Sequence, residues 1–172
     1  TFHAGMDLYF LRHDGEAATI EDFVQVFADV SGRDLSQFAL WYNQAGTPNL
    51  TISSHYDANE QELTLEIEQS VPPTPSESRK RLMHIPLAFG LVGKAGKDLS
   101  YTAAEGAIVD DGVIHIRKRR HTVRFSGVVE RPALSLNRGF SAPVTLSVEQ
   151  RADDQFFLAS HDSDAFSRWQ AV

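Results

Sequence analysis

The spacing of apolar residues changes at Pro48, and this change limits the possible folds more than any other feature of the sequence. Before Pro48, apolar residues recur every three to four positions, as in an amphipathic helix; after it they alternate with polar residues, as in a strand. Thr47-Pro48 itself favours extended backbone, because proline fixes its own φ and disfavours helical geometry in the preceding residue. The sequence therefore predicts a junction between a helical segment and a β-domain.

Three short helices are predicted before this junction. The first has an apolar face made of Phe2, Met6, Tyr9 and Phe10. Thr19 is suited to cap the second helix, because its hydroxyl can accept a hydrogen bond from a free backbone N–H, and Gly32 is suited to end it. Asp34 is predicted to cap a third helix that continues to Gly46.

The rest of the chain is predicted to be mainly β. Alternating runs lie at residues 50–56, 63–67, 85–91, 113–116, 122–128 and 144–148. A further strand is predicted at Phe156 to Ala159, returning across a turn at Asp153-Asp154, and a last helix is predicted to start at Ser163 or Asp164. Seven or eight short strands separated by turns favour an Ig-like or fibronectin-like antiparallel β-sandwich over a barrel or a βαβ fold.

Composition excludes several classes of function. The 172 residues include no cysteine, so disulfides, thiolate zinc sites and a cysteine nucleophile are excluded, and a reducing, cytoplasmic location is expected. The net charge of −7 argues against nucleic acid or an anionic membrane as the main partner. The basic run Arg117–His121 is predicted to be a solvated hairpin tip, and no apolar run is long enough to span a bilayer.

The residues themselves predict no catalytic or metal site. Seven histidines are present, but none forms His-x-x-x-His or HExxH. His115 and His121 are predicted to lie at solvated strand ends, and His84 to be structural. The paired aspartates at 110–111 and 153–154 are predicted to stabilise turns locally.

Two stretches, "GMDLYFLRHDGEAAT" and "WYNQAGTP", resemble the bacterial aminopeptidase N family of zinc metalloaminopeptidases. "HIP", "SAPV" and "FSRW" extend the resemblance in the same order through the chain. The motif residues expected to have structural roles are Gly5, Tyr9, Arg12, His13, Asp14, Gly15, Trp41, Tyr42, Gln44, Gly46, Pro48 and Trp169.

This resemblance implies a non-catalytic piece of a peptidase that removes N-terminal residues from peptides. The family's HExxH helix, its zinc-binding glutamate and its Gly-x-Met-Glu-Asn strand are expected upstream of Thr1, so zinc is expected in the parent enzyme and no cofactor in this chain. Both chain ends fall inside predicted helices, which also predicts a fragment.

The implied domains are the helical end of the thermolysin-like catalytic domain (1–46), the β-sandwich (47–161) and the first turns of the C-terminal helical domain (162–172). The remainder of the same polypeptide is the expected partner, and the sandwich is expected to be a spacer. An autonomous Ig-like binding module is the alternative, and a nucleic-acid contact through Arg117 to Arg120 is a weaker one.

Overall fold

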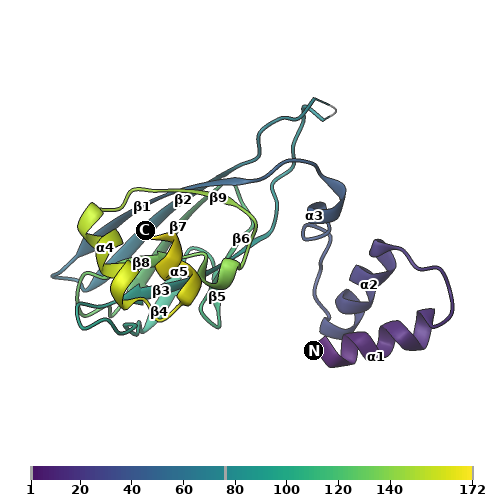
Figure 1. The fold of residues 1–172 in the computed structure, drawn as a ribbon, viewed down its shortest axis with the longest axis horizontal. Helices are drawn as coiled ribbons and strands as arrows, with labels where there is room; N and C mark the ends of the chain where they lie inside the picture. The colour runs from purple at the N-terminus through teal and green to yellow at the C-terminus, as the bar shows by residue number, and fades with distance from the viewer. Residues whose placement is uncertain (1, 76, 172) are drawn as a thin grey trace. The chain divides into compact units, whose positions relative to one another are not determined.

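The computed structural model describes residues 2–75 and 77–171, which form two compact units that divide between Ala45 and Gly46 (Figure 1). The first unit contains α1 (Phe2–His13), α2 (Ile20–Ser31) and α3 (Leu40–Asn43). Thr19 caps α2 as predicted: its hydroxyl accepts from the Asp22 N–H (3.1 Å), and the Asp22 carboxylate accepts from the Thr19 N–H (2.8 Å). Gly32 ends α2 in the left-handed conformation, with φ of 64°.

The α1–α2 pair is held by a glycine and a row of rings. Gly5 is the buried residue of α1, and a Cβ added there would lie 2.4 Å from the Phe27 ring. Tyr9 packs edge-on against Phe23 at 5.3 Å between ring centroids. Phe10 is 57% exposed, so the predicted apolar face of α1 is only partly buried within this unit.

The third helix is shorter than predicted. It covers Leu40 to Asn43, whereas a helix from Asp34 to Gly46 was expected. The Asp34 carboxylate accepts from the Ser36 N–H (2.9 Å), so it closes a local turn in place of capping a long helix.

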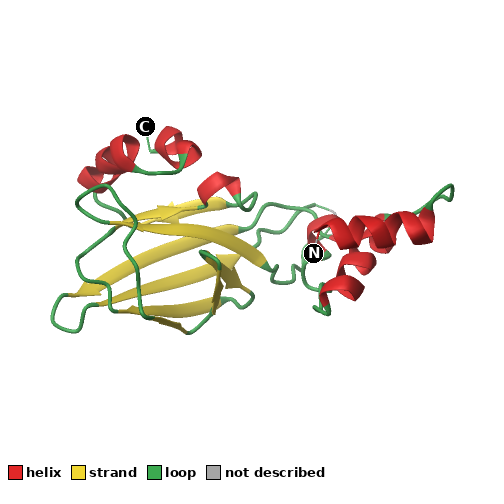
Figure 2. Ribbon diagram, turned by 90° about the horizontal axis from the view of Figure 1, so that it is seen from below, coloured by secondary structure: helices red, strands yellow, loops and turns green. Residues whose placement is uncertain are grey.

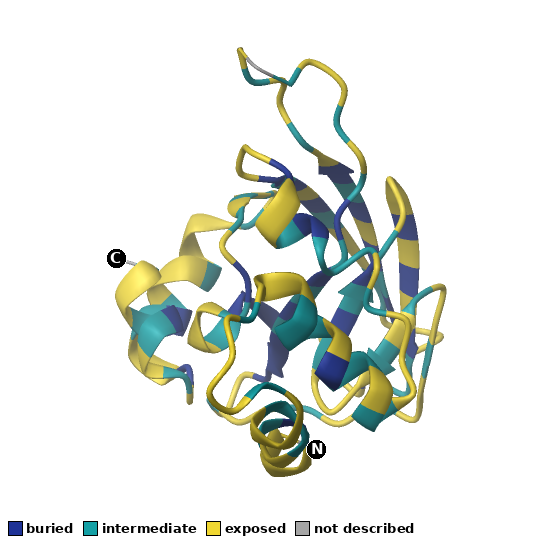
Figure 3. Ribbon diagram, turned by 90° about the vertical axis from the view of Figure 1, so that its right-hand side faces the viewer, coloured by how far each residue is buried: buried dark blue, intermediate teal, exposed yellow. Residues whose placement is uncertain are grey.

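The second unit is a sandwich of two sheets, which confirms the predicted mainly-β class. The strands are β1 (Asn49–Asp57), β2 (Glu62–Ser70), β3 (Ile85–Val92), β4 (Ala103–Glu105), β5 (Ile108–Asp110), β6 (Val113–Ile116), β7 (Arg120–Ser126), β8 (Ala133–Leu136) and β9 (Thr145–Val148). One sheet has the order β4-β7-β2-β1-β9 and the other β5-β6-β3-β8. Buried and exposed residues alternate along the strands, as a half-buried sheet requires (Figure 3).

The core lies between the sheets and contains the residues that alternation predicted. Its fully buried side chains include Leu50, Ile52, Leu65, Ile85, Leu87, Ile114, Ile116 and Phe125. All four residues of β8 are buried, and so is Val92, because α4 (Ala152–His161) covers the outer surface there through Leu158.

Two predictions about the strands were wrong in detail. The described chain has nine strands where seven or eight were expected, because β4 and β5 have three residues each and β8 has no alternation. Not every pair is antiparallel, since β9 runs parallel to β1, with Asn49 opposite Thr145. The chain reaches β9 from the other sheet, and alternation gives no information on strand direction.

The predicted strand at Phe156 to Ala159 is also wrong, because these residues belong to α4. Asp153 and Asp154 lie in the first turn of that helix, where negative charge is favourable, and do not form a hairpin turn. A short last helix, α5 (Ala165–Gln170), follows with Asp164 as its N-cap, as predicted. Both helices pack on the sandwich (Figure 2).

Candidate functional site

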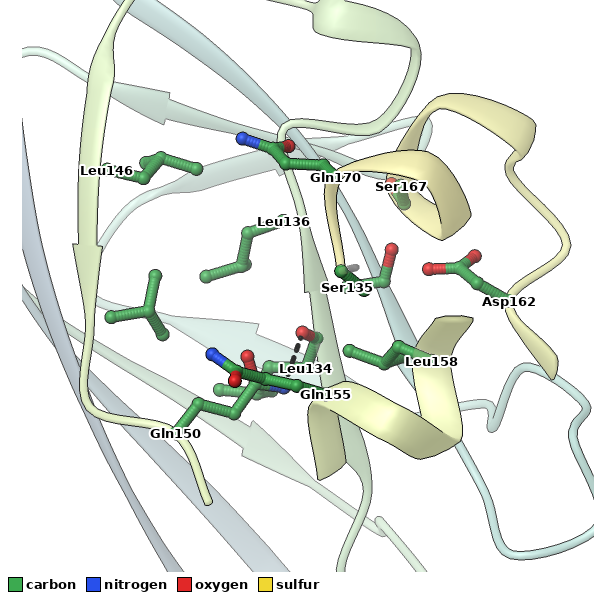
Figure 4. Close-up of a pocket in the computed structure, with 12 residues that line it drawn as sticks. Leu134, Ser135, Leu136, Leu146, Gln150, Gln155, Leu158, Asp162, Ser167 and Gln170 are labelled. Atoms are coloured by element: carbon green, nitrogen blue, oxygen red, sulfur yellow. Dashed lines mark hydrogen bonds between the residues drawn. The ribbon is translucent and has the colours of Figure 1, made fainter. Parts of the chain in front are cut away.

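A cavity of about 340 Å³ lies at the open edge of the sandwich, where β8 and β9 are the outermost strands of the two sheets. Its strand wall consists of Leu134, Ser135, Leu136, Leu146 and Val148 (Figure 4). Residues of α4 and α5 and of the segment between them form the opposite wall. The Gln150 amide donates to the Leu134 carbonyl (3.1 Å), so a side chain satisfies a backbone group at this edge.

Two acceptors are buried in the helical wall of this edge cavity. Asp162, between α4 and α5, is 2% exposed, and Ser167, on α5, is 8% exposed. Asp162 Oδ1 accepts from Arg138 Nη2 (2.9 Å) and from the Asp164 N–H (2.9 Å). Asp162 Oδ2 and Ser167 Oγ have no hydrogen-bond partner in the described part of the chain.

Arg138 joins three segments beside this cavity. Its Nη1 and Nη2 donate to the two oxygens of Asp98 (2.6 and 2.8 Å), and its Nε donates to Ser135 Oγ (2.8 Å). The guanidinium lies against Gly90, where a Cβ would come within 1.9 Å of its Cζ. The Asp98 hydrogen bonds outweigh burial and raise the pKa of Arg138, so this cation stays charged.

A histidine pair lies on the sheet that contains β3 and β6. His84 Nε2 and His115 Nδ1 are 2.8 Å apart, because His115 pairs with Pro86 and His84, two residues before Pro86, is its diagonal neighbour across the two strands. The sequence prediction missed this pair, since it compared ligand spacings along one strand and the pairing register was not known. Two imidazoles do not complete a metal site.

The basic run between β6 and β7 is not the tip of a hairpin, because these two strands belong to different sheets. His121 is 6% exposed, so the prediction of a solvated strand end was wrong. Its Nε2 accepts from the N–H groups of Arg117 and Lys118 (3.1 Å each), and its Nδ1 lies 3.2 Å from the Gly106 carbonyl. The imidazole therefore holds the backbone that crosses between the sheets.

The motif residues shared with the aminopeptidase family lie in several places. Arg12 forms an ion pair with Asp29 of α2 (2.5 Å), and His13 packs on Tyr9 (5.4 Å between ring centroids). Gly15 and Gly46 have φ of 75° and 97°, which favours glycine. Asp14 and Trp169 are exposed, Trp41 and Tyr42 lie at α3, and Gln44 and Pro48 are buried. Within the first unit, the contact of Arg12 with Asp29 joins α1 to α2, and that of His13 with Tyr9 lies within α1.

Residues 2–75 and 77–171 contain no group of three His, Cys, Asp or Glu side chains that converge on a point where a metal ion would bind. None of their helices has the length and apolar character that a bilayer crossing requires. Ile108, 59% exposed, is the one large hydrophobic residue in a described strand that faces solvent.

The two stacked sheets define the class of protein as an Ig-like β-sandwich. Residues 46–149 match the family described as a domain of unknown function (DUF3458) with an Ig-like fold, and the chain belongs to that family.

The relatives give a more particular identification: the chain is similar to part of aminopeptidase N. It is 46% identical to the enzyme of that name from Caulobacter vibrioides, 39% to that of Escherichia coli and 36% to that of Haemophilus influenzae. Each match covers 99% of this chain but 19% of the relative's length.

A solved structure agrees with these relatives. Legionella pneumophila aminopeptidase A in complex with aspartic acid superposes with a TM-score of 0.81 at 27% identity, over 97% of this chain and 18% of that one. The chain thus spans about a fifth of the length of the aminopeptidases that it matches.

Proposed function

We propose that this chain is a non-catalytic part of a zinc-dependent aminopeptidase, in which the sandwich sets a C-terminal helical domain against the catalytic domain. The observation that carries the proposal is the match of nearly the whole chain to a fifth of aminopeptidase N. In this proposal the chain contains three parts: residues 1–46 are the end of the catalytic domain, 47–161 are the spacer, and 162–172 are the start of the helical domain. Its proposed partners are the other domains of the same polypeptide.

The geometry of the described residues supports a structural role. His3 and His13 are ten residues apart on α1, roughly 15 Å along the axis, so they cannot bind one ion together. A catalytic zinc needs about three protein ligands with an open fourth position. Residues 2–75 and 77–171 do not fit such a site, so we infer that zinc would be held by the proposed parent outside this segment, and the parent's cytoplasmic location stays a prediction.

A first experiment tests the non-catalytic part of the proposal. The purified 172-residue chain is analysed for bound metal and assayed with alanyl and leucyl anilides. Neither stoichiometric zinc nor hydrolysis is expected. Zinc in a one-to-one ratio together with chelator-sensitive hydrolysis contradicts the proposal.

A second experiment tests the spacer role in the Caulobacter vibrioides enzyme, which is 46% identical to this chain over the matched segment. One variant carries this chain in place of its own segment, and the other carries a flexible Gly-Ser linker in place of the sandwich. The first is expected to keep aminopeptidase activity and the second to lose it. Full activity with the linker shows that the sandwich does not position the domains.

A further inference from the structure

The edge cavity is lined by two residues with buried oxygen atoms that have no hydrogen-bond partner in the described part of the chain. Asp162 Oδ2 and Ser167 Oγ are both buried in its helical wall, and neither has a partner in the described residues. Buried polar atoms of this kind are uncommon, because an unmet hydrogen bond destabilises the fold. An ionised carboxylate can only accept, so the group that satisfies Asp162 Oδ2 must donate.

The charges around these atoms favour a cationic donor. Asp98, Asp162 and Asp164 surround Arg138, which binds the first two through its guanidinium. Arg168 also contacts this aspartate, since its Nη1 donates to the Asp162 backbone carbonyl (2.6 Å). Asp162 is therefore a buried carboxylate whose second oxygen, Oδ2, has no donor among the described residues, and a cationic donor forms a stronger hydrogen bond to it than a neutral one.

The remaining walls of the cavity are suited to an aliphatic chain. Leu134, Leu136, Leu146, Val148 and Leu158 provide apolar surface, and Figure 4 shows Leu136 and Leu146 across from the segment that carries Asp162 and Ser167. The amides of Gln150, Gln155 and Gln170 add polar groups. A volume of about 340 Å³ falls at the small end of ligand pockets, which span roughly 300–1,000 Å³.

We propose that the edge cavity binds a primary ammonium group carried on an aliphatic chain. The ammonium donates to Asp162 Oδ2 and Ser167 Oγ, and the methylene groups lie along the leucine wall. A free alkylamine and a lysine side chain both present this chemistry. The site lies on the sandwich and its two last helices, so the inference does not depend on peptidase activity.

The test is a titration of the ¹⁵N-labelled 172-residue chain followed by amide NMR. The ammonium probes are n-pentylamine, for a free amine, and Nα-acetyl-lysine methylamide, for a lysine side chain. The matched probes without a cation are n-pentanol and pentanoate. Either ammonium probe is expected to shift the amides of residues that line the cavity, with n-pentanol at least about tenfold weaker, and the tighter ammonium probe identifies the source.

Variants separate this site from general attraction to an acidic protein. Asp162→Asn is expected to weaken ammonium binding about tenfold and Ser167→Ala roughly threefold, because each removes one acceptor. Asp153→Asn is the matched control: it also removes one carboxylate charge, but Asp153 lies in the first turn of α4, its side chain is 84% exposed and it does not line the cavity. This control is expected to bind like the unmodified chain.

Several results overturn the proposal. These are no shift of the lining residues with either ammonium probe, equally tight binding of n-pentanol, or equal weakening by Asp162→Asn and Asp153→Asn. Where the spectrum of Asp162→Asn shows that the fold is lost, Ser167→Ala decides, and an unchanged affinity in that variant overturns the proposal.

Discussion

Replacing Arg138 with alanine is expected to destabilise the sandwich strongly, because it removes the cation from a buried carboxylate. The Arg138 side chain is 14% exposed and that of Asp162 is fully buried. The guanidinium also donates to Asp98 and to Ser135 Oγ. The alanine variant loses all of these hydrogen bonds at once and leaves the Asp162 charge uncompensated.

The two ion pairs contribute unequally. Removing one partner of a buried pair costs about 3–5 kcal/mol, because the remaining charge stays desolvated. The Asp98 side chain is 45% exposed, and a pair of that kind contributes roughly 0.2–1 kcal/mol. The expected loss in the free energy of unfolding is therefore about 3 kcal/mol for Arg138→Ala and under about 1 kcal/mol for Asp98→Ala.

Urea unfolding followed by circular dichroism measures both values. The midpoint of Arg138→Ala is expected to fall by roughly 1–2 M urea relative to the unmodified chain. The double variant Arg138→Met/Asp162→Leu is expected to be more stable than Arg138→Ala, since it leaves no unpaired buried charge. A loss for Arg138→Ala that is no larger than for Asp98→Ala refutes this reasoning.

Three further predictions follow from local geometry. Gly106→Ala is expected to lower the free energy of unfolding by over about 3 kcal/mol, because its Cβ would lie 1.8 Å from a carbonyl of β7. Gly139→Ala is also at positive φ but has open space around it, so it is expected to cost about 1 kcal/mol. Equal urea midpoints for the two variants contradict this. Thr19→Ala is expected to reduce the stability of α2 by about 1 kcal/mol, and unchanged helicity on heating argues against the cap. Burial raises the pKa of Asp164, but backbone hydrogen bonds from Ser167 and Gly139 outweigh it, so the folded pKa lies below the ordinary 3.8. The stabilisation from ionised Asp164 is therefore present above pH 3.8 and is lost as the pH falls through the lower folded pKa. The stability of Asp164→Asn is expected to decline less steeply on the acid side than that of the unmodified chain. An identical dependence of stability on pH in the two proteins counts against this.

Sequence reasoning predicted the parts of the fold in which one face is buried. The alternation of Leu63, Leu65 and Ile67 predicted β2, and in the structure these residues are 2% exposed or less. The capping residue Thr19 predicted the start of α2 correctly, because a cap depends only on neighbours up to three residues away. Such signals are local, so they can be identified without tertiary information.

The features that were missed depend on tertiary contacts. The four residues of β8 are buried on both faces, so "ALSL" has no alternation to detect. "FFLA" in α4 is too short for its period to distinguish helix from strand, and its burial through Leu158 comes from β8. The edge cavity combines β8, β9, α4 and α5, and neither the spacing nor the composition of any one of them indicates Asp162.

The parallel pairing of β9 with β1 determines when the sandwich can finish folding during synthesis. β1 is among the first parts of this unit to leave the ribosome and β9 among the last, with Leu50 opposite Leu146 in the completed sheet. Until β9 emerges, β1 has an unpaired edge that another nascent chain can join. The protein is therefore most exposed to misassociation during the interval in which the ribosome translates β2 to β8, and a chaperone that shields β1 would have its greatest effect in that interval.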